Sequence, residues 1–335
     1  MFLKFNIFYL LFFCFLLSCL QESNKQSFDS ISDQIVNDSL NPDLYYQRGM
    51  NYYKSYNYDY AIYDFRNANR LDSLNIHYKL YLAFSLYESY KKNKDTEYLN
   101  DALLYFQEIV SSQDTSSLSY DDNYFNYKTI KYASLTKVCE IYTLFSEYDK
   151  SFICIDNMNK ENPLDYYSYY LRGFVLENLQ QIDQAIYYYH KSISLNESHF
   201  DSYFKIGFIN HNMNDSSCIY YYNEAFKIDS SNINLLYNIA KYYQDNSYFN
   251  YAIKYYNKIL IQDQFNEKAN YNLAYIYFYL KDYEQSANHA SEVIYSNNKN
   301  HFAYNIRSMC FKNLNRIEEA IRDSLKCAEL KKIKN

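Results

Sequence analysis

The sequence predicts an all-α protein, built as a solenoid of helix pairs, and three observations support that prediction. The chain has 335 residues but only three Gly and two Pro, the residues on which tight turns and β-bulges usually depend. Apolar residues make up 48% of it, which is enough to bury a core. Small residues recur about every 34 positions, a period that is typical of helical repeat arrays.

Composition also limits the kind of partner. The net charge is −6, with acidic and basic residues interspersed, so the chain lacks the basic stripe that would follow a phosphate backbone. Nucleic acid is therefore an unfavoured partner. Tyr occurs 46 times, but Tyr, Asn, Ile, Lys and Phe all have AT-rich codons, and we do not take abundant Tyr alone as evidence of a site.

Residues 1–18 read as a signal peptide that is cleaved from the mature chain. One Lys precedes an apolar run from Phe5 to Leu17, which is short for a membrane-spanning helix of about 20 residues. The run ends in Leu16, Leu17, Ser18 and Cys19, which resembles the lipobox of bacterial lipoproteins. The resemblance implies cleavage before Cys19 and attachment of a diacylglycerol to its thiol. An uncleaved anchor or an ordinary signal peptide is the alternative.

Residues 19–41 are polar and without sustained periodicity, so we expect a flexible tether between the membrane and the fold. A solenoid is expected over residues 42–334. Pairs of small residues, eleven or twelve positions apart, organise it, and each of the three Gly begins one. The starting residues of the last five pairs, Gly173, Gly207, Ala240, Ala274 and Ser308, lie 34, 33, 34 and 34 positions apart.

The pairs resemble the tetratricopeptide repeat, which has small residues at positions 8, 20 and 27 and large ones at 4, 11 and 24. The resemblance implies a right-handed α-solenoid of eight helix–turn–helix repeats that begin near residues 42, 76, 132, 166, 200, 233, 267 and 301. Positions 8 and 20 would let the two helices of a repeat approach closely. The expected repeat-packing residues are Gly49, Ala61, Gly173, Ala185, Gly207, Cys218, Ala240, Ala252, Ala274, Ser286, Ser308 and Ala320.

Two repeats depart from this pattern. In repeat two Ala83 and Ala102 are 19 positions apart, seven more than elsewhere. Seven residues make about two helical turns, so longer helices would absorb them, with the polar run 91–97 capping the extension. Repeat three is degenerate, and a loop-like interruption precedes it at about residues 111–122. In repeat eight, polar residues such as Arg322 and Lys326 predict a capping helix that is not a dimerisation surface.

By the same resemblance, the first helix of each repeat lines a concave groove for a partner. Aromatic rings in such a groove suit an extended or helical peptide, although ordinary packing would also explain any single ring. Some members bind a C-terminal carboxylate through Lys and Asn; only Lys241 is similar, and it lacks matching partners. The expected groove residues are Tyr46, Met50, Phe84, Tyr87, Tyr167, Tyr170, Phe174, Phe204, Phe208, His211, Tyr237, Lys241, Tyr271, Tyr275 and Phe278.

Motifs for catalysis are absent from the sequence: it has no HExxH, no paired CxxC, no Gly-rich phosphate loop and no GxSxG. The spacing of the His residues matches no metal site. Cys139, Cys218 and Cys327 take small-residue positions, which indicates packing, while Cys310 and Cys327 share a repeat and would be able to pair if close enough. We therefore expect no enzyme activity, no metal and no cofactor.

Together these observations and the resemblance predict a non-catalytic, membrane-anchored lipoprotein scaffold of the bacterial cell envelope, serving assembly, secretion or a surface complex. The lipid at Cys19 would hold it to the cell membrane or the outer membrane, facing the periplasm or the exterior. Its partner would be a protein or peptide of the envelope. The alternative is a module that binds envelope polysaccharide, because Tyr faces also stack on sugar rings.

Overall fold

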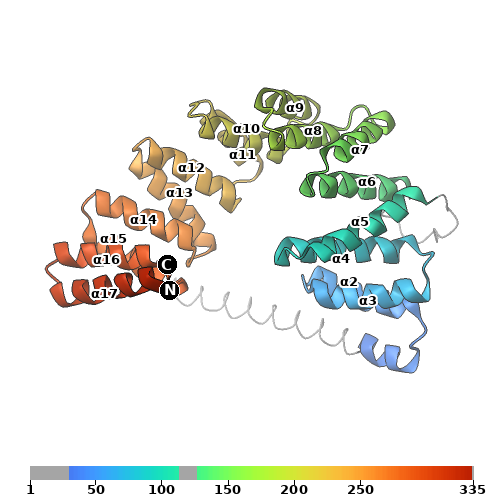
Figure 1. Cartoon of the computed structure of the whole chain (residues 1–335), viewed down its shortest axis with the longest axis horizontal. Coiled ribbons are helices and arrows are strands. Elements are labelled where there is room, and N and C mark those ends of the chain that lie inside the picture. Colours follow the sequence, from blue (N-terminus) through green and yellow to red (C-terminus); the bar gives the residue numbers. More distant parts are fainter. Residues whose placement is uncertain (1–29, 113–126, 334–335) are drawn as a thin grey trace, which may run out of the picture. The chain divides into compact units, whose positions relative to one another are not determined.

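The computed structural model describes residues 30–112 and 127–333, and all the regular structure in these residues is helical. The expected all-α solenoid of helix pairs is confirmed (Figure 1). Its labelled helices are α2 (Pro42–Lys54), α3 (Tyr58–Leu71), α4 (Ile76–Asn93), α5 (Thr96–Ser111), α6 (Tyr127–Leu144), α7 (Tyr148–Glu161), α8 (Tyr166–Asn178), α9 (Ile182–Leu195), α10 (Phe200–Asn212), α11 (Cys218–Ile228), α12 (Ile233–Asp245), α13 (Phe249–Gln262), α14 (Glu267–Tyr279), α15 (Tyr283–Ser296), α16 (His301–Asn313) and α17 (Ile317–Ile333).

The chain divides into two compact units, unit 1 over residues 1–175 and unit 2 over residues 176–335. In unit 1 helix α2 packs on α3, α4 on α5, and α6 on α7. In unit 2 the pairs are α10 with α11, α12 with α13, α14 with α15, and α16 with α17. Within each unit, second helices also pack on the first helix of the next pair, as α3 does on α4, α5 on α6, α13 on α14 and α15 on α16.

Asparagine caps begin many of the first helices. The side chains of Asn41, Asn75, Asn232, Asn266 and Asn300 each accept a hydrogen bond from a backbone N–H in the first turn that follows. Such a bond satisfies one of the donors that a helix start leaves without a partner. First helices accordingly begin at residues 42, 76, 166, 200, 233, 267 and 301, where the repeats were expected; α6 begins at Tyr127, ahead of residue 132.

Gly is absent from the left-handed position of the described turns that join the two helices of a repeat. One residue in each described turn has a left-handed backbone, with φ between 57° and 63°, and none of these residues is Gly. Only Gly adopts this conformation without a steric cost. The turns therefore carry a steric cost, and the three Gly lie in helices instead. The left-handed residues are Tyr56, Lys94, Ser146, Gln180, Asn214, Ser247, Lys281 and Asn315.

Gly49 and Gly207 make room for aromatic rings. A Cβ added to Gly49 would lie 2.8 Å from Cε1 of Phe65, and one added to Gly207 would lie 2.7 Å from Cδ1 of Tyr222. Phe65 and Tyr222 occupy position 24 of their repeats, and both are fully buried. The first obstacle to a larger residue at position 8 is thus this ring, not the residue at position 20. The remaining Gly, Gly173, lies in α8.

Positions 8 and 20 nevertheless meet closely where one of them is Ser. The Ser308 hydroxyl donates to the Ala320 carbonyl at 2.7 Å, and the Ser286 hydroxyl donates to the Ala274 carbonyl, also at 2.7 Å. Each bond spans twelve residues and joins the two helices of one repeat. Only small side chains leave the two backbones this close.

Repeat two contains the longer helices that its spacing predicts. Helix α4 has 18 residues and α5 has 16, whereas α2 and α3 have 13 and 14. Only Lys94 and Asp95 separate α4 from α5, within the polar run expected to cap the extension. Residues 113–126, which contain most of the expected interruption, lie outside the described part of the chain.

The tether expected over residues 19–41 is wrong for residues 30–37, which form a helix. Ile35 is buried, and Arg48 Nη1 donates to the Ser32 hydroxyl at 3.1 Å, so this helix packs on repeat one. It escaped prediction because two turns with one buried residue give almost no periodic pattern. The leader and Cys19 lie outside the described residues, and among the described helices none is long and apolar enough to cross a membrane.

The same side-chain arrangement occurs near both ends of the stack. In repeat one Arg48 forms two hydrogen bonds to Asp64, at 2.7 and 2.8 Å, besides its bond to Ser32. In repeat eight Arg307 forms two hydrogen bonds to Asp323, also at 2.7 and 2.8 Å, and Nη1 donates to Ser291 at 3.0 Å. The residues are spaced by 16 in both cases, so Ser32 stands where a preceding repeat would have its second helix.

Candidate functional site

The first helices of unit 2 hold an aromatic row that is partly open to solvent. On α10 the rings of Phe200, Phe204 and Phe208 stack in sequence, with centroids 5.8 and 6.4 Å apart. They lie one helical turn apart, which puts them on one face. Phe208 at the end of the row is 37% exposed. This row provides a rigid apolar surface on which the Phe208 ring is exposed.

The row extends onto α12 and α14. Tyr237 is half-buried, receives a hydrogen bond from Asn272 at 3.5 Å, and lies beneath the Lys268 ammonium group at 5.8 Å. Tyr271 is half-buried and meets Phe302 edge-on at 6.5 Å, whereas Tyr275, one turn further on, is 49% exposed. Among the expected groove residues of unit 2, the exposed rings are therefore Phe208 and Tyr275, and Phe302 beside Tyr271 is 55% exposed as well.

Three other expected groove residues of unit 2 are held by polar or aromatic neighbours. Lys241 forms an ion pair with Asp245, and His211 Nε2 lies 3.8 Å from the same carboxylate. Burial lowers the pKa of His211, so it is mostly neutral at pH 7. Asp245 already neutralises Lys241, which argues against a carboxylate clamp there. The half-buried Phe278 packs against Tyr283 with centroids 5.6 Å apart.

In unit 1 the expected groove residues pack into the core more than they face solvent. Tyr46 contacts Tyr78, with ring centroids 5.1 Å apart, and Phe84 contacts Phe106 at 5.2 Å. Met50 packs against the same cluster, and Tyr87 is buried. These residues join repeats one and two, so their contacts are largely structural.

A carboxylate that sequence reasoning missed links three first helices of unit 1. Glu140 on α6 accepts hydrogen bonds from Tyr87 on α4 at 2.9 Å and from Tyr167 on α8 at 2.7 Å. Lys137 donates to the same carboxylate at 2.7 Å and lies 4.9 Å from the Tyr87 ring centre. Burial, with the Glu140 charge, raises the pKa of Tyr87. The signal was available: Glu140 holds the repeat position that Phe84 and Phe174 occupy in the neighbouring repeats.

The remaining predicted rings of unit 1 form a short ladder on α8. Tyr167 and Tyr170 have centroids 5.4 Å apart, and Tyr170 stacks on Phe174 at 6.5 Å with an interplanar angle of 8°. All three side chains are half-buried. The ladder resembles the row on α10, and the two rows belong to different units.

The cysteines fall into two groups. Cys139 and Cys154 form a disulfide between α6 and α7, with Cα atoms 5.5 Å apart. Sequence reasoning missed this pair because it assigned Cys139 to packing. Cys218, Cys310 and Cys327 are free and buried, so Cys310 and Cys327 do not pair in the structure. Burial raises the pKa of the Cys218 thiol to about 11, which leaves it protonated and unreactive at neutral pH.

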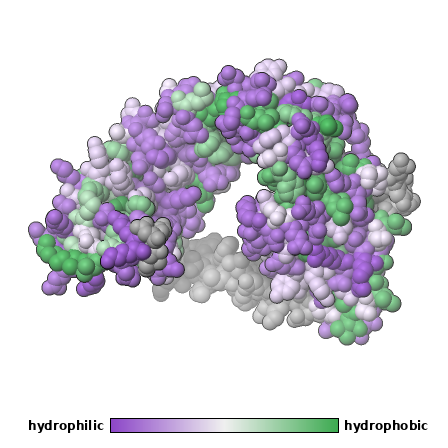
Figure 2. Space-filling model, viewed as in Figure 1, coloured by the Kyte–Doolittle hydropathy of each residue, from purple (hydrophilic) through white to green (hydrophobic). Residues whose placement is uncertain are grey.

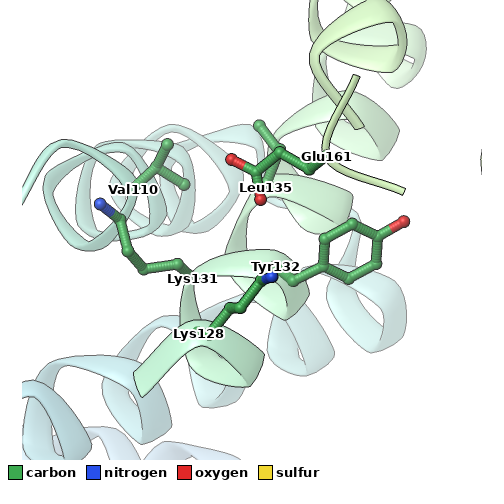
Figure 3. A pocket seen from close by; sticks show the side chains of 6 residues that line it. All are labelled: Val110, Lys128, Lys131, Tyr132, Leu135 and Glu161. Atoms are coloured by element: carbon green, nitrogen blue, oxygen red, sulfur yellow. The ribbon is translucent and has the colours of Figure 1, made fainter. Parts of the chain in front are cut away.

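A cavity of about 440 Å³ in unit 1 lies between α5, α6 and the end of α7. Figure 3 shows Lys131 and Val110 on one side of it and Tyr132 on another. Lys131 Nζ donates to the Ser112 carbonyl at 2.9 Å, which ties this side chain to the end of α5. No group of three or more metal-binding side chains occurs among the described residues.

A second exposed set, on the second helices, was not predicted. Position 22 carries the exposed residues Tyr63, Leu104 and Ile153 in unit 1. In unit 2 it carries the exposed Tyr187 and Tyr220, and then changes to polar residues in the last three repeats. Comparing the repeats at this position would have found the set, because the change from apolar to polar is visible in the sequence.

Comparison with known families identifies the helix pairs. Residues 166–199, 267–300 and 303–333 match the tetratricopeptide repeat family. These three segments are tetratricopeptide repeats. Two of the matched segments begin at the first residues of α8 and α14, and all three correspond to repeats expected from the sequence. No curated protein sequence matches the chain.

Solved structures share the fold at low sequence identity. Human IFIT1, solved as a dimer with m7Gppp-AAAA, superposes with a TM-score of 0.50 and 11% identity, over 92% of this chain and 68% of that one. MamA gives a TM-score of 0.47 and 15% identity over 50% of this chain and 92% of that one. PilW, a type IV pilus biogenesis factor, gives 0.47 and 14% over 58% and 91%. At these identities the likeness concerns the fold alone.

Proposed function

We propose that this tetratricopeptide repeat protein is a non-catalytic scaffold that binds a protein partner in the bacterial cell envelope. The observation that supports it most directly is the aromatic row of unit 2, in which Phe208 and Tyr275 remain accessible above half-buried rings. Aromatic rings that packing already holds rigid lose little entropy on binding, which is typical of peptide-recognition surfaces. The described Cys side chains, which could otherwise react, are paired in a disulfide or buried.

Binding is tested by changing the accessible rings without changing the core. The variant Phe208→Ser with Tyr275→Ser is expected to lose at least ten-fold in affinity for the native partner, captured from envelope extract by the full chain and then purified. Tyr251→Ser is the matched control, because Tyr251 on α13 is 54% exposed on a second helix. Equal binding by the double variant and the native chain would contradict the proposed groove.

The same experiment separates a protein partner from a polysaccharide. Titration of the full chain with purified cell-wall fragments should give no heat of binding if the partner is a protein. Saturable binding of such fragments, abolished in Phe208→Ser with Tyr275→Ser, would favour the glycan-binding alternative, because Tyr and Phe faces also stack on sugars.

The membrane anchor is part of the proposal and rests on the sequence around Cys19. The disulfide between Cys139 and Cys154 supports an oxidising compartment, as expected outside the cytoplasm. Replacing Cys19 with Ala should move the protein from the membrane fraction to the soluble fraction, since lipid alone would hold it there. Continued retention in membranes would remove the lipoprotein part of the proposal and leave the binding surface untouched.

A further inference from the structure

The last helix of the stack leaves an apolar face open. On α17, Ile317 is 52% exposed, Ile321 is 55% exposed and Leu325 is 67% exposed. They are four residues apart and thus about 6 Å apart along one side of the helix. The space-filling view shows hydrophobic surface at the edge of unit 2 over α16 and α17 (Figure 2). The polar capping face expected from the sequence is therefore wrong on this side of α17.

Part of this face, at position 21, corresponds to the surface that each earlier repeat covers with the next first helix. Ile321 holds position 21, which is apolar in all eight repeats and is buried or half-buried in the seven before it. Position 25 also points to the next repeat: Asp156 pairs there with Arg172, and Ser291 with Arg307. Within the described chain, only α17 has these positions without a following helix.

At position 25 the residue becomes less polar in the last repeat, whereas a capping helix would be expected to become more polar. In the seven earlier repeats this position is polar, with residues such as Asp156, His190 and Ser291, whereas in repeat eight it is Leu325. A solvent-facing end would be expected to become more polar, because terminal repeats need a soluble outer face. Here the residue becomes apolar while it remains exposed, at 67% for Leu325, which indicates an interface.

We infer that this face binds the same face of a second copy of the chain, with the two α17 helices antiparallel. The stripe is symmetric about Ile321, so a two-fold axis there pairs Ile317 with Leu325 of the partner subunit and Ile321 with its own copy. Glu318 and Arg322 lie on one edge of the stripe. In the antiparallel pair, Glu318 falls within about 3 Å along the axis of Arg322 of the partner subunit.

The charges fit this arrangement. Glu318 and Arg322 are exposed, and neither forms an ion pair with any other described residue. The two-fold axis would produce two reciprocal Glu–Arg pairs along one edge of the apolar contact. The first turn of α17 carries Glu318 and Glu319, and its last turn carries Lys331 and Lys332. A parallel pair would place like charges together, whereas the antiparallel pair places opposite charges together.

The test uses the full chain in detergent and measures mass by sedimentation velocity. The native chain should form a dimer, and Ile321→Glu should weaken association at least ten-fold with unchanged helical circular dichroism. Tyr251→Glu, at a similarly exposed ring on α13, should remain dimeric. A native chain that is monomeric at high micromolar concentration would overturn the proposal and leave the end face to another protein.

Charge reversal and cross-linking test the geometry. Glu318→Arg and Arg322→Glu should each weaken the dimer, and the two together should restore it. The variant Ile321→Cys should form a disulfide between the two copies of the chain. Ile317→Cys and Leu325→Cys should cross-link only when the two variants are mixed. Self-linking of Ile317→Cys, or no recovery in the double charge variant, would exclude the antiparallel arrangement.

Discussion

The two ends of the repeat stack use the same internal device and finish differently. Arg48 in repeat one and Arg307 in repeat eight each hold a buried Asp of the same repeat and a Ser of the preceding helix. At the N-terminal end that preceding helix, residues 30–37, is the first described element. At the C-terminal end α17 presents Ile317, Ile321 and Leu325 to solvent.

The comparison indicates that a short helix is enough to cover the outer side of repeat one. Eight helical residues, with one buried Ile and one hydrogen bond to Arg48, stand in for a preceding repeat. No described residues follow α17 in the same way.

The largest effect is expected when an Arg at either end is removed. Arg48→Ala should lower the free energy of unfolding by about 3–5 kcal/mol, because the buried carboxylate of Asp64 loses its partner. Arg307→Ala should have a similar effect through Asp323. Urea unfolding followed by circular dichroism measures both changes.

The control for the Arg variants is a surface ion pair in unit 1. Arg66 and Asp101 lie 3.0 Å apart with both side chains exposed, so Arg66→Ala should cost less than about 1 kcal/mol. If Arg48→Ala changed the free energy of unfolding no more than Arg66→Ala, the buried pair would not stabilise the N-terminal end.

A smaller effect is expected at position 8, which also differs between the ends. Gly49→Ala should destabilise repeat one by about 1–3 kcal/mol, although Ala is the better helix former, because its Cβ would meet the buried Phe65 ring at 2.8 Å. At the other end Ser308 occupies this position opposite the smaller Ser324. Combining Gly49→Ala with Phe65→Leu should recover part of the loss. Stabilisation by Gly49→Ala would show that helix propensity outweighs the clash.

Much of the fold could be predicted because single residues dictate it locally. Small residues such as Gly207 and Cys218 mark close packing, and Asn232 or Asn266 marks where a helix begins. Repeat three lacks such markers, and its first helix was placed late. Glu140 and the Cys139–Cys154 disulfide were missed because they depend on which side chains meet in space. The exposed face of α17 was missed because the prediction noted the polar residues and not Leu325.

The left-handed turn residues should respond to Gly by different amounts at the two ends. Tyr56→Gly in repeat one should stabilise the chain by up to about 1 kcal/mol, because Gly adopts φ near 60° without the steric cost that a Tyr side chain incurs. Asn315→Gly in repeat eight should gain less, since Asn tolerates this conformation. Thermal unfolding of both variants gives the comparison, and a larger gain at Asn315 would contradict this reading of the turns.

Removing one hydrogen bond from each Arg separates the two ends most directly. Ser32→Ala and Ser291→Ala each remove one hydrogen bond from an Arg, worth about 1 kcal/mol or slightly more. Ser32 belongs to a two-turn helix, so its loss should raise hydrogen exchange only in residues 30–37. Ser291 lies in α15, which packs on α14 and α16, so exchange there should change little. Equal changes in hydrogen exchange at both sites would contradict this expectation. Residues 30–37 would then be as stable as an internal helix such as α15.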